Sequence, residues 1–286
     1  MKVVLFCGGL GMRIREAGEN VPKPMVTIGY RPIIWHVMKY YAHYGHKEFI
    51  LCLGYRGDVI KDYFLNYSEC LSNDFVMSEG GRRLDLMGSD IHDWKVTFVE
   101  TGKNSNIGQR LKAVRHLIGN DEEFLGNYSD GLSDLPLPKQ LEHFRRHQAI
   151  ASFVSVKPTL SYHLVSAERD GAVTALEPIQ EKPGIRINGG FFMFRREIFD
   201  YMGDGEELVC EPFERLIQAH RLRAYQHDGF WMSMDTFKDR QQLEEIHGRG
   251  EAPWQLWTHA SAPHAKSSVL LPAPVIREPA ARMRVV

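Results

Sequence analysis

A glycine-rich hexad, Gly8-Gly9-Leu10-Gly11-Met12-Arg13, directly follows the apolar run at residues 2–7. Glycines let backbone N–H groups approach phosphate oxygens closely, and an arginine can hold an anion through two parallel hydrogen bonds. The hexad therefore predicts a phosphate-binding turn, with a plain turn after a first strand as the alternative. It lacks the third glycine of the dinucleotide fingerprint and the G-K-[ST] of a P-loop, which argues against ordinary kinases and dehydrogenases.

A single lysine lies between two prolines in Pro22-Lys23-Pro24-Met25. The prolines fix the backbone on either side and so restrain where the ammonium group can point. A lysine placed in this way suits a triphosphate. Taken alone, however, an exposed lysine in a turn is the simpler interpretation, because most lysines are solvated.

Two aspartates are candidates for a Mg²⁺ site. Asp130 follows the apolar run at 123–128 and precedes Gly131, which places it at the carboxyl end of a strand, where open α/β sheets bind their ligands. Mg²⁺ keeps several waters and takes one or two protein carboxylates besides phosphate oxygens, so one partner carboxylate is needed. Asp235, followed by Thr236, is the best candidate. An Asx turn or a helix N-cap is the alternative for each aspartate.

Two further motifs, Glu181-Lys182-Pro183 and Asn188-Gly189-Gly190-Phe191-Phe192, lie close together in the sequence. A glutamate can accept hydrogen bonds from sugar hydroxyls, a lysine can pair with a phosphate, and Asn188 offers both a donor and an acceptor. The motifs are candidates for binding a phosphorylated sugar, with a surface turn as the alternative.

Alternating strands and helices must position these residues. Apolar runs at 2–7 and 49–54 each end at glycine, which is typical of strands buried on both faces of a parallel sheet. Further strands are expected at 95–100, 123–128 and 151–156, and helices at 33–44, 59–66, 108–117 and 138–148. The alternation indicates βαβ units, and hence an α/β fold with a Rossmann-like mixed, mainly parallel sheet flanked by helices. The second half is expected to hold a β-rich substrate-binding region.

Composition narrows the class of protein. The 286 residues are 43% hydrophobic, enough for a sizeable core, and a net charge of −1 without long single-sign blocks argues against nucleic-acid or membrane partners. The four cysteines form no CxxC pair and are expected to be reduced. No run approaches the roughly 18 apolar residues of a membrane helix, and residues 2–7 are too short for a signal peptide, so the cytoplasm is the expected compartment.

Taken together and in this order, the motifs resemble those of the sugar-1-phosphate nucleotidylyltransferase family, most closely the glucose-1-phosphate cytidylyltransferases. The resemblance covers about residues 1–257. Besides the motifs above, it rests on Gly54-Tyr55-Arg56-Gly57, Gly108-Gln109-Arg110-Leu111-Lys112, Tyr128-Ser129-Asp130-Gly131, Glu211-Pro212, Gly229-Phe230-Trp231 and Ala252-Pro253-Trp254. An ordered series of this kind is far more specific than any single motif.

The resemblance implies transfer of a nucleotidyl group from CTP to a sugar 1-phosphate, with release of pyrophosphate and Mg²⁺ as the cofactor. Its implied catalytic residues are Arg13, Lys23, Asp130 and Asp235, the two aspartates being the metal ligands. The implied nucleotide-binding residues are Phe6, Cys7, Gly8, Gly9, Leu10, Gly11, Met12, Arg13, Lys23, Ser105, Arg110 and Ser129. The implied acceptor-binding residues are Tyr128, Glu181, Lys182, Asn188 and Gly189.

The resemblance also implies a homo-oligomer and a nucleotidyltransferase catalytic domain at 1–257, divided into a nucleotide-binding half at about 1–135 and an acceptor-binding half at about 136–257. Residues 258–286, rich in Pro, Ala, Ser and His, are expected to form a disordered or loosely packed tail. Residues 78–93 carry glycine pairs and mixed charges, and a mobile loop or hairpin is expected there.

Some residues depart from the family pattern and keep alternatives open. Met12 replaces a usual threonine and Ser129 a usual glycine, and within 159–165 Tyr162 and His163 are bulkier than the short turn of glucose-using relatives. A phosphorylated acceptor other than glucose 1-phosphate, and dTTP or UTP in place of CTP, are the alternatives. A metal-dependent glycosyltransferase would need an Asp-x-Asp site, whereas Asp130 and Asp134 are four apart. A non-catalytic nucleotide-binding module would leave two carboxylates facing phosphates without a metal, which repels them.

Overall fold

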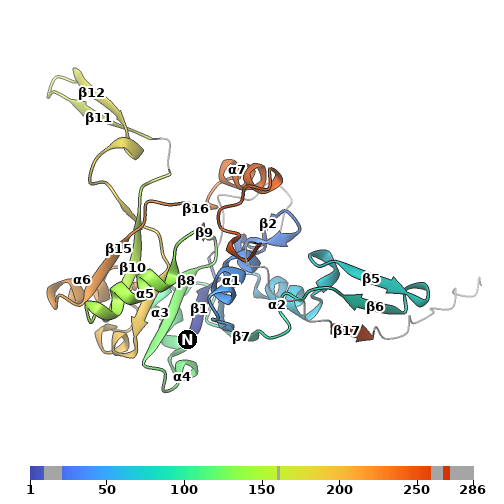
Figure 1. Cartoon of the computed structure of the whole chain (residues 1–286). Helices are drawn as coiled ribbons and strands as arrows, with labels where there is room; N and C mark the ends of the chain where they lie inside the picture. The colour runs from blue at the N-terminus through green and yellow to red at the C-terminus, as the bar shows by residue number, and fades with distance from the viewer. Residues whose placement is uncertain (10–20, 160–161, 259–266, 271–286) are drawn as a thin grey trace, which may run out of the picture. The chain divides into compact units, whose positions relative to one another are not determined.

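The computed structural model describes residues 1–9, 21–159, 162–258 and 267–270 (Figure 1). The chain divides into two compact units, of which unit 1 comprises Met1–Asn66 and Asp93–Ala260 and unit 2 comprises Tyr67–His92 and Ser261–Val286. Of the tail expected at 258–286, Ser267–Leu270 forms strand β17 in unit 2. Residues 259–266 and 271–286 lie outside the described part of the chain.

Within its described residues, unit 1 contains an eight-stranded sheet in the order β13-β10-β14-β8-β1-β4-β7, with β15 also paired to β10. The strands are β1 (Lys2–Phe6), β4 (Glu48–Leu53), β7 (Lys95–Glu100), β8 (Glu123–Tyr128), β10 (Ala151–Val156), β13 (Ile187–Asn188), β14 (Phe192–Arg195) and β15 (Leu222–Gln226). Strands β8, β1, β4 and β7 run parallel, and β14 is antiparallel to both β8 and β10. The mixed, mainly parallel sheet predicted from the sequence is confirmed.

Successive side chains of a strand point to opposite faces of the sheet, and the parallel strands here are apolar at successive positions. Both faces of the sheet are therefore covered by apolar cores. Val3 and Leu5 of β1 join one core with α1 (Ile33–His43), α2 (Gly57–Leu65), α5 (Leu137–Arg146) and α7 (Phe237–Gly248). Val4 and Phe6 join the other core with α3 (Ile107–Ala113), α4 (Arg115–Ile118) and α6 (Glu211–Gln218). The helix expected at 108–117 is thus two short helices that meet at Val114.

A short two-stranded ribbon, separate from the large sheet, joins β9 (Gly131–Ser133) to β16 (Trp231–Ser233). The strands are antiparallel, with Gly131 opposite Ser233 and Ser133 opposite Trp231. Asp130 therefore precedes β9 at the end of the ribbon where Met234 and Asp235 follow β16, and Met234 N donates to Asp130 O at 2.9 Å. We call this element the β9–β16 ribbon.

Other short elements complete unit 1. A hairpin of β11 (His163–Ala167) and β12 (Val173–Pro178) forms a separate two-stranded sheet in the second half of the chain (Figure 1). Strands β2 (Thr27–Ile28) and β3 (Arg31–Pro32) pair with each other. Among the described residues of both units, the 3-10 helices are η1 (Lys23–Met25), η2 (Glu69–Leu71), η3 (Glu79–Gly81), η4 (Ile179–Glu181), η5 (Arg196–Tyr201) and η6 (Leu256–Thr258).

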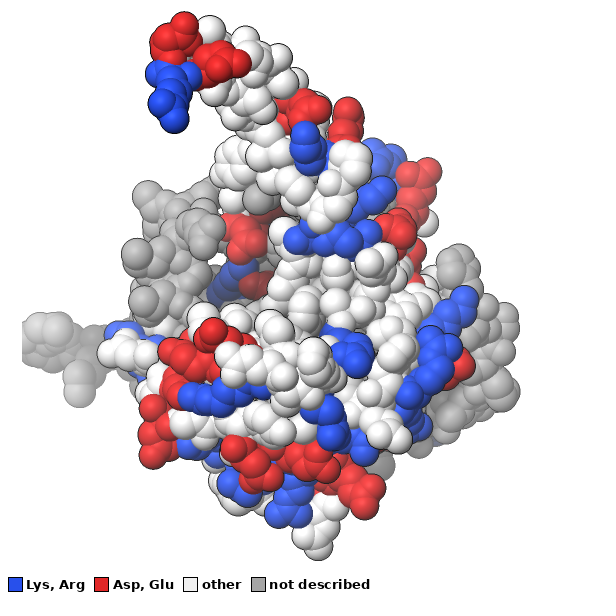
Figure 2. Space-filling view, turned by 90° about the vertical axis from the view of Figure 1, so that its left-hand side faces the viewer, with Lys and Arg blue, Asp and Glu red and all other residues white. Residues whose placement is uncertain are grey.

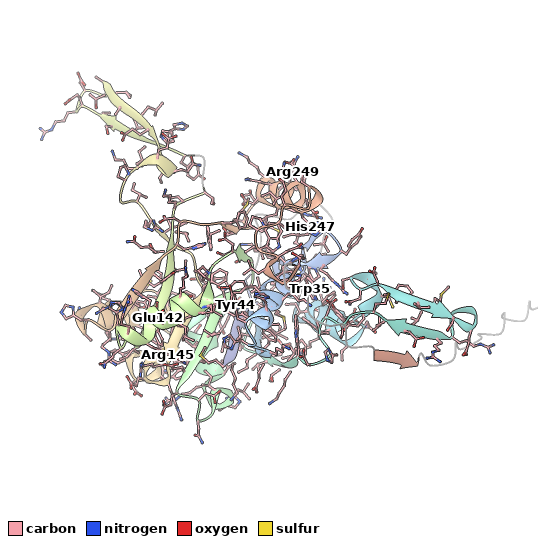
Figure 3. All side chains as sticks on the ribbon, in the orientation of Figure 1. Trp35, Tyr44, Glu142, Arg145, His247 and Arg249 are labelled. Carbon is pink, nitrogen blue, oxygen red and sulfur yellow. The ribbon has the colours of Figure 1, made fainter. Side chains whose placement is uncertain are left out.

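An aromatic cluster packs the end of unit 1 against α1. Trp254 is 1% exposed, and its indole N–H donates to His36 Nδ1 at 3.4 Å. The His36 ring also lies 6.1 Å from the His247 ring of α7 and 5.1 Å from that of Trp35. Trp35 and His247 mark the two helices in Figure 3. The Ala252-Pro253-Trp254 motif therefore has a structural explanation, since it supplies the central indole of a buried cluster.

Unit 2 is a three-stranded sheet in the order β17-β6-β5, with β5 (Phe75–Ser78) and β6 (Arg83–Leu86) forming a hairpin. The segment expected as a mobile loop or hairpin thus contributes to a hairpin that begins at Phe75. Buried Asp90 accepts hydrogen bonds from the side chains of Tyr67, Ser72 and Asn73 and so ties both ends of the segment together. Among the described residues of both units, every helix is too short or too polar to traverse a bilayer.

Candidate active site

Three residues from distant parts of the chain meet at the carboxyl end of β8. The Lys23 ammonium nitrogen lies 2.5 Å from Asp130 Oδ2 and 2.7 Å from Asp235 Oδ1. Lys23 begins η1, Asp130 follows β8, and Asp235 follows β16. The structure therefore brings together both aspartates and the proline-flanked lysine that the sequence pointed to.

Local structure fixes the two carboxylates. The antiparallel register of the β9–β16 ribbon places Asp130 beside Met234, and Ser233 Oγ donates to Asp235 Oδ2 at 2.7 Å. The N-cap of α7 is Thr236, whose hydroxyl accepts from Asp239 N. The alternative in which Asp235 serves only as the N-cap of this helix is therefore wrong.

The Lys23 side chain is 15% exposed, so its charge depends on its partners. Burial lowers the pKa of the ammonium group, but the charges and hydrogen bonds of Asp130 and Asp235 outweigh burial, and the net effect raises the Lys23 pKa. Lys23 is therefore protonated across the physiological range. The solvated turn lysine considered as an alternative does not describe this residue.

The two carboxylates fit the requirements of a magnesium ion. Asp130 Oδ2 and Asp235 Oδ1 converge on a single point, where the lysine nitrogen lies. Hard carboxylate oxygens are the ligands that Mg²⁺ prefers, and one or two of them suffice when phosphate oxygens and water complete its shell. Within the described part of the chain, no group of three or more His, Cys, Asp or Glu side chains could hold a metal ion. The geometry thus suits an ion that is shared with a bound phosphate.

Arg110 supports the chain that leads into the glycine-rich hexad. Its side chain is 3% exposed, and its guanidinium donates to the carbonyl oxygens of Gly8 at 3.1 Å and Leu53 at 3.0 Å. A Cβ on Gly8 would lie 2.1 Å from this guanidinium, and one on Gly54 would lie 2.8 Å from Gly8 Cα. Both glycines are thus required by close packing. The expected contact between Arg110 and a nucleotide stays a prediction.

Other expected nucleotide-binding residues lie near the start of this loop. Ser129 is buried, and its hydroxyl donates to Phe6 O at 2.9 Å, which ties the end of β8 to the end of β1. The Ser105 hydroxyl donates to Thr101 O at 2.6 Å. Cys7 is buried and, like the other three cysteines, free, as expected. Leu10, Gly11, Met12 and Arg13 lie outside the described residues.

A cavity of about 310 Å³ opens beside the two aspartates, of the size that small-molecule sites occupy. Asp130 and Asp235 line it together with Tyr128, Asn188 and Gly189, three of the expected acceptor-binding residues. Sequence reasoning gave no function to Trp231, which also lines the cavity and donates from its indole N–H to Gly189 O at 2.8 Å. Its place in the Gly229-Phe230-Trp231 motif, just before Asp235, was the available signal.

The double glycine after Asn188 makes a tight turn at the cavity. Gly190 has a φ of +74°, and a Cβ there would lie 2.6 Å from Asn127 Oδ1. Asn188 Oδ1 accepts from Gly190 N at 2.9 Å, and Asn127 Oδ1 accepts from Phe191 N at 2.8 Å. These bonds hold Asn188 at the cavity wall.

Glu181 and Lys182 are not among the residues that line this cavity. Both are exposed at the base of the β11–β12 hairpin, and the Lys182 ammonium lies 2.5 Å from Glu177 Oε2. Tyr162 is 66% exposed and also stands apart from the lining, whereas Thr159 contributes to it. The acceptor contacts expected of Glu181 and Lys182 stay predictions.

Asp134 lies at the opposite end of the β9–β16 ribbon from Asp130. Asp134 Oδ1 is 2.7 Å from His227 Nε2, and Asp134 N donates to Phe230 O at 3.2 Å. A Cβ on Gly229 would collide with both Asp134 and His227, so the glycine permits this contact. Asp130 and Asp134 therefore do not form the paired diphosphate site that a glycosyltransferase would need.

Charges on the visible surface agree with a ligand held locally. Figure 2 shows basic and acidic residues interleaved over one face, without a broad region of either sign. An anionic ligand on this face would therefore be held by a few placed groups rather than by a long-range field.

Comparison with known proteins shows the class to which this fold and this site belong, the enzymes of nucleotidyl transfer. Residues 2–243 match the nucleotidyl transferase family, and the chain belongs to this family. It is 39% identical over 259 residues to a glucose-1-phosphate cytidylyltransferase of Salmonella typhimurium, covering 90% of this chain and 100% of that protein. A probable glucose-1-phosphate cytidylyltransferase of Bacillus subtilis is 36% identical with the same coverage.

Solved structures share the fold. HddC from Yersinia pseudotuberculosis gives a TM-score of 0.59 at 20% identity and covers 86% of this chain and 99% of that chain. A UDP-glucose pyrophosphorylase complexed with UDP-glucose gives a TM-score of 0.63 at 17% identity, covering 87% of this chain and 98% of that chain. The predicted fold class is therefore confirmed.

Proposed function

We propose that the protein transfers the cytidylyl group of CTP to a sugar 1-phosphate, glucose 1-phosphate or a relative, and releases pyrophosphate. The observation that carries the proposal is the meeting of Lys23, Asp130 and Asp235 beside the 310 Å³ cavity. Its support for CTP is the 39% identity to a cytidylyltransferase along 90% of the chain. The same chemistry with dTTP or UTP, or with another phosphorylated acceptor, is the alternative.

In this mechanism the acceptor phosphate attacks the α-phosphorus of the nucleotide in line. One oxygen–phosphorus bond forms, the bond to the bridging oxygen of the β-phosphate breaks, and pyrophosphate leaves with the electron pair. A phosphate monoester is already a nucleophile at neutral pH, so no covalent enzyme intermediate is required. Catalysis then consists of holding two polyanions together and neutralising their charge.

Asp130 and Asp235 would hold Mg²⁺, which when bound supplies positive charge to the triphosphate. The Lys23 ammonium, protonated in its site, would contribute charge at the phosphates, and we assign similar contributions to Arg13 and Lys182. Burial, and then the negative charges of Glu207 and Asp130, raise the pKa of Tyr128 to about 12. The Tyr128 hydroxyl therefore keeps its proton and can donate a hydrogen bond to the acceptor at the cavity wall.

A pyrophosphate-release assay tests the proposal. Purified protein with Mg²⁺ is offered CTP, dTTP, UTP and other triphosphates against a panel of sugar 1-phosphates, and the expected combination is CTP with a hexose 1-phosphate. No pyrophosphate release from any pair of triphosphate and sugar 1-phosphate would contradict the proposed function.

The metal assignment is tested in the same assay with Asp130→Asn and Asp235→Asn. We expect each to lower turnover at least about 100-fold, the scale on which enzymes lose an electrostatic catalyst. Circular dichroism and the melting temperature should stay close to wild type, because both side chains are partly exposed. Lys61→Met, which removes an exposed pair with Glu100, is the control. Near-normal turnover in either aspartate variant would refute the assignment.

A further inference from the structure

The Lys23 ammonium occupies the point on which the two metal-binding carboxylates converge. Its nitrogen lies 2.5 Å from Asp130 Oδ2 and 2.7 Å from Asp235 Oδ1. Mg²⁺ binds carboxylate oxygens at about 2.0–2.1 Å, so an ion held by these same two oxygens would lie at nearly the same place. The lysine nitrogen and the metal therefore exclude each other from this position.

The ammonium also gives the two carboxylates their nearby countercharge. Two carboxylates that share one site repel each other unless a cation lies between them. Lys23 therefore holds the two aspartates together before any ligand arrives.

The surrounding structure favours a movement of the Lys23 side chain alone. Pro22 and Pro24 restrain the backbone, and Met25 N donates to Pro22 O at 2.8 Å in the single turn η1. A lysine side chain is a four-carbon stem with several rotatable bonds and a compact charge at its end. Its ammonium group can thus change partners while η1 stays in place.

We propose that Lys23 is an internal counter-ion that excludes the divalent metal from the free enzyme. Its ammonium group leaves the position between the two aspartates only when a nucleoside triphosphate binds together with the metal. The triphosphate supplies new anionic partners for the ammonium group, and the metal replaces that group between Asp130 and Asp235. Metal and nucleotide therefore bind together. The inference rests on the proposed function, because it requires a triphosphate that binds beside Lys23.

The test measures Mn²⁺ binding by electron paramagnetic resonance in the absence of nucleotide. Wild type is compared with Lys23→Met and Lys23→Gln, which remove the charge, and with Lys23→Arg, which keeps it. We expect both neutral variants to bind Mn²⁺ with a dissociation constant at least about tenfold lower than wild type, equivalent to about 1.4 kcal/mol. Lys23→Arg should behave as wild type, and so should Lys61→Met, which removes only an exposed pair with Glu100. Adding Asp130→Asn to Lys23→Met should abolish the tight binding.

Thermal unfolding provides a second readout for the neutral variants. Without the ammonium charge the two aspartates repel each other more strongly, so Lys23→Met and Lys23→Gln should melt below wild type, and Mn²⁺ alone should restore much of the loss. Equal Mn²⁺ affinity in wild type and both neutral variants overturns the inference, as does tight Mn²⁺ binding by wild type without nucleotide.

Pyrophosphate release by wild type keeps the two proposals apart. Release with CTP, combined with unchanged Mn²⁺ affinity in the neutral variants, contradicts the counter-ion inference alone. Tighter Mn²⁺ binding by those variants, combined with no release across the substrate matrix, contradicts the proposed function alone.

Discussion

Gly8 and Gly9 are adjacent in sequence but differ in their surroundings. A Cβ on Gly8 would overlap the buried Arg110 guanidinium, whereas among the described residues nothing lies within 4 Å of a Cβ on Gly9. Arg110 holds the Gly8 carbonyl, so Gly8 belongs to the packed support of the loop. Gly9 is exposed, and there a side chain would instead obstruct a phosphate that approaches the backbone.

We predict that Gly8→Ala lowers the melting temperature, because either Arg110 or the loop must shift, at a cost on the order of 1–3 kcal/mol typical of overpacking. Gly9→Ala should leave the melting temperature unchanged and weaken CTP binding. Differential scanning fluorimetry with and without CTP measures both effects. Equal melting temperatures in the two variants would contradict the packing argument.

Residue types predicted part of the site from sequence. Asp130 and Lys23 were found because a carboxylate at a strand end and a lysine between prolines each restrict geometry locally. The contact of Arg110 with the Gly8 carbonyl could not be found, because it depends on how β1, β4 and α3 pack together. Likewise, the burial of Trp231 against Gly189 follows from the fold rather than from its neighbours in sequence.

At the scale of elements, the β9–β16 ribbon aligns Asp130 with Asp235. Met234 N bonds Asp130 O at one end, and Asp134 and His227 pair at the other. His227 is buried, and its carbonyl accepts from Arg186 at 2.7 Å, which connects the ribbon to the residue before Ile187 of β13. The far end of the ribbon is therefore anchored to the same strand that presents Asn188 to the cavity.

Replacing Asp134 with asparagine removes the charged partner of His227 and keeps the shape of the side chain. Hydrogen bonds to charged groups contribute about 1.5–3 kcal/mol, so we expect the free energy of unfolding to fall by an amount of this order in urea titrations. Turnover should fall as well, because the ribbon aligns Asp130 with Asp235. Asp93→Asn, which breaks an exposed pair with Lys47, is the matched control and should change neither quantity measurably. An unaltered unfolding midpoint in Asp134→Asn would show that the pair does not anchor the ribbon.

Long, strongly patterned elements were predictable, and short ones were not. Strands β1, β4, β7, β8 and β10 were expected within one or two residues of their bounds, because continuous apolar runs indicate strands buried on both faces. Strands β9 and β16 have three residues each, and β13 has two, too few to establish a period of two. These short strands carry or flank the site, so its assembly had to come from the structure.

At the scale of the whole molecule, unit 2 is built from an internal excursion, Tyr67–His92, together with a strand from the far end of the chain. The sequence predicted a mobile loop or hairpin at 78–93 but no pairing with β17, since nothing in a four-residue strand identifies its partner. The match to the Salmonella cytidylyltransferase covers 90% of this chain and the family match ends at residue 243. All candidate site residues lie within that match.

We predict that a chain ending at Thr258 retains pyrophosphate release near the wild-type level. Strand β6 loses its pairing with β17 in this variant, so the amides of Arg83–Leu86 should exchange with deuterium faster. Hydrogen-exchange mass spectrometry and the release assay measure the two effects, with α1 amides as the internal reference. The molar masses of the full-length and truncated chains, measured by light scattering, test the expected homo-oligomer. Loss of release on truncation would assign the end of the chain a part in the reaction.

The two walls of the cavity differ in their freedom to diverge. Gly131, Trp231 and Ser233 belong to the ribbon that aligns Asp130 with Asp235, whereas Thr159 comes from the segment after β10, outside the ribbon. Substitutions in the second wall can therefore change which sugar fits the cavity without disturbing the alignment of Asp130 with Asp235. A substitution on the ribbon, in contrast, changes both the fit of the substrate and the turnover. New substrate preferences should therefore evolve mainly through substitutions in the wall that includes Thr159.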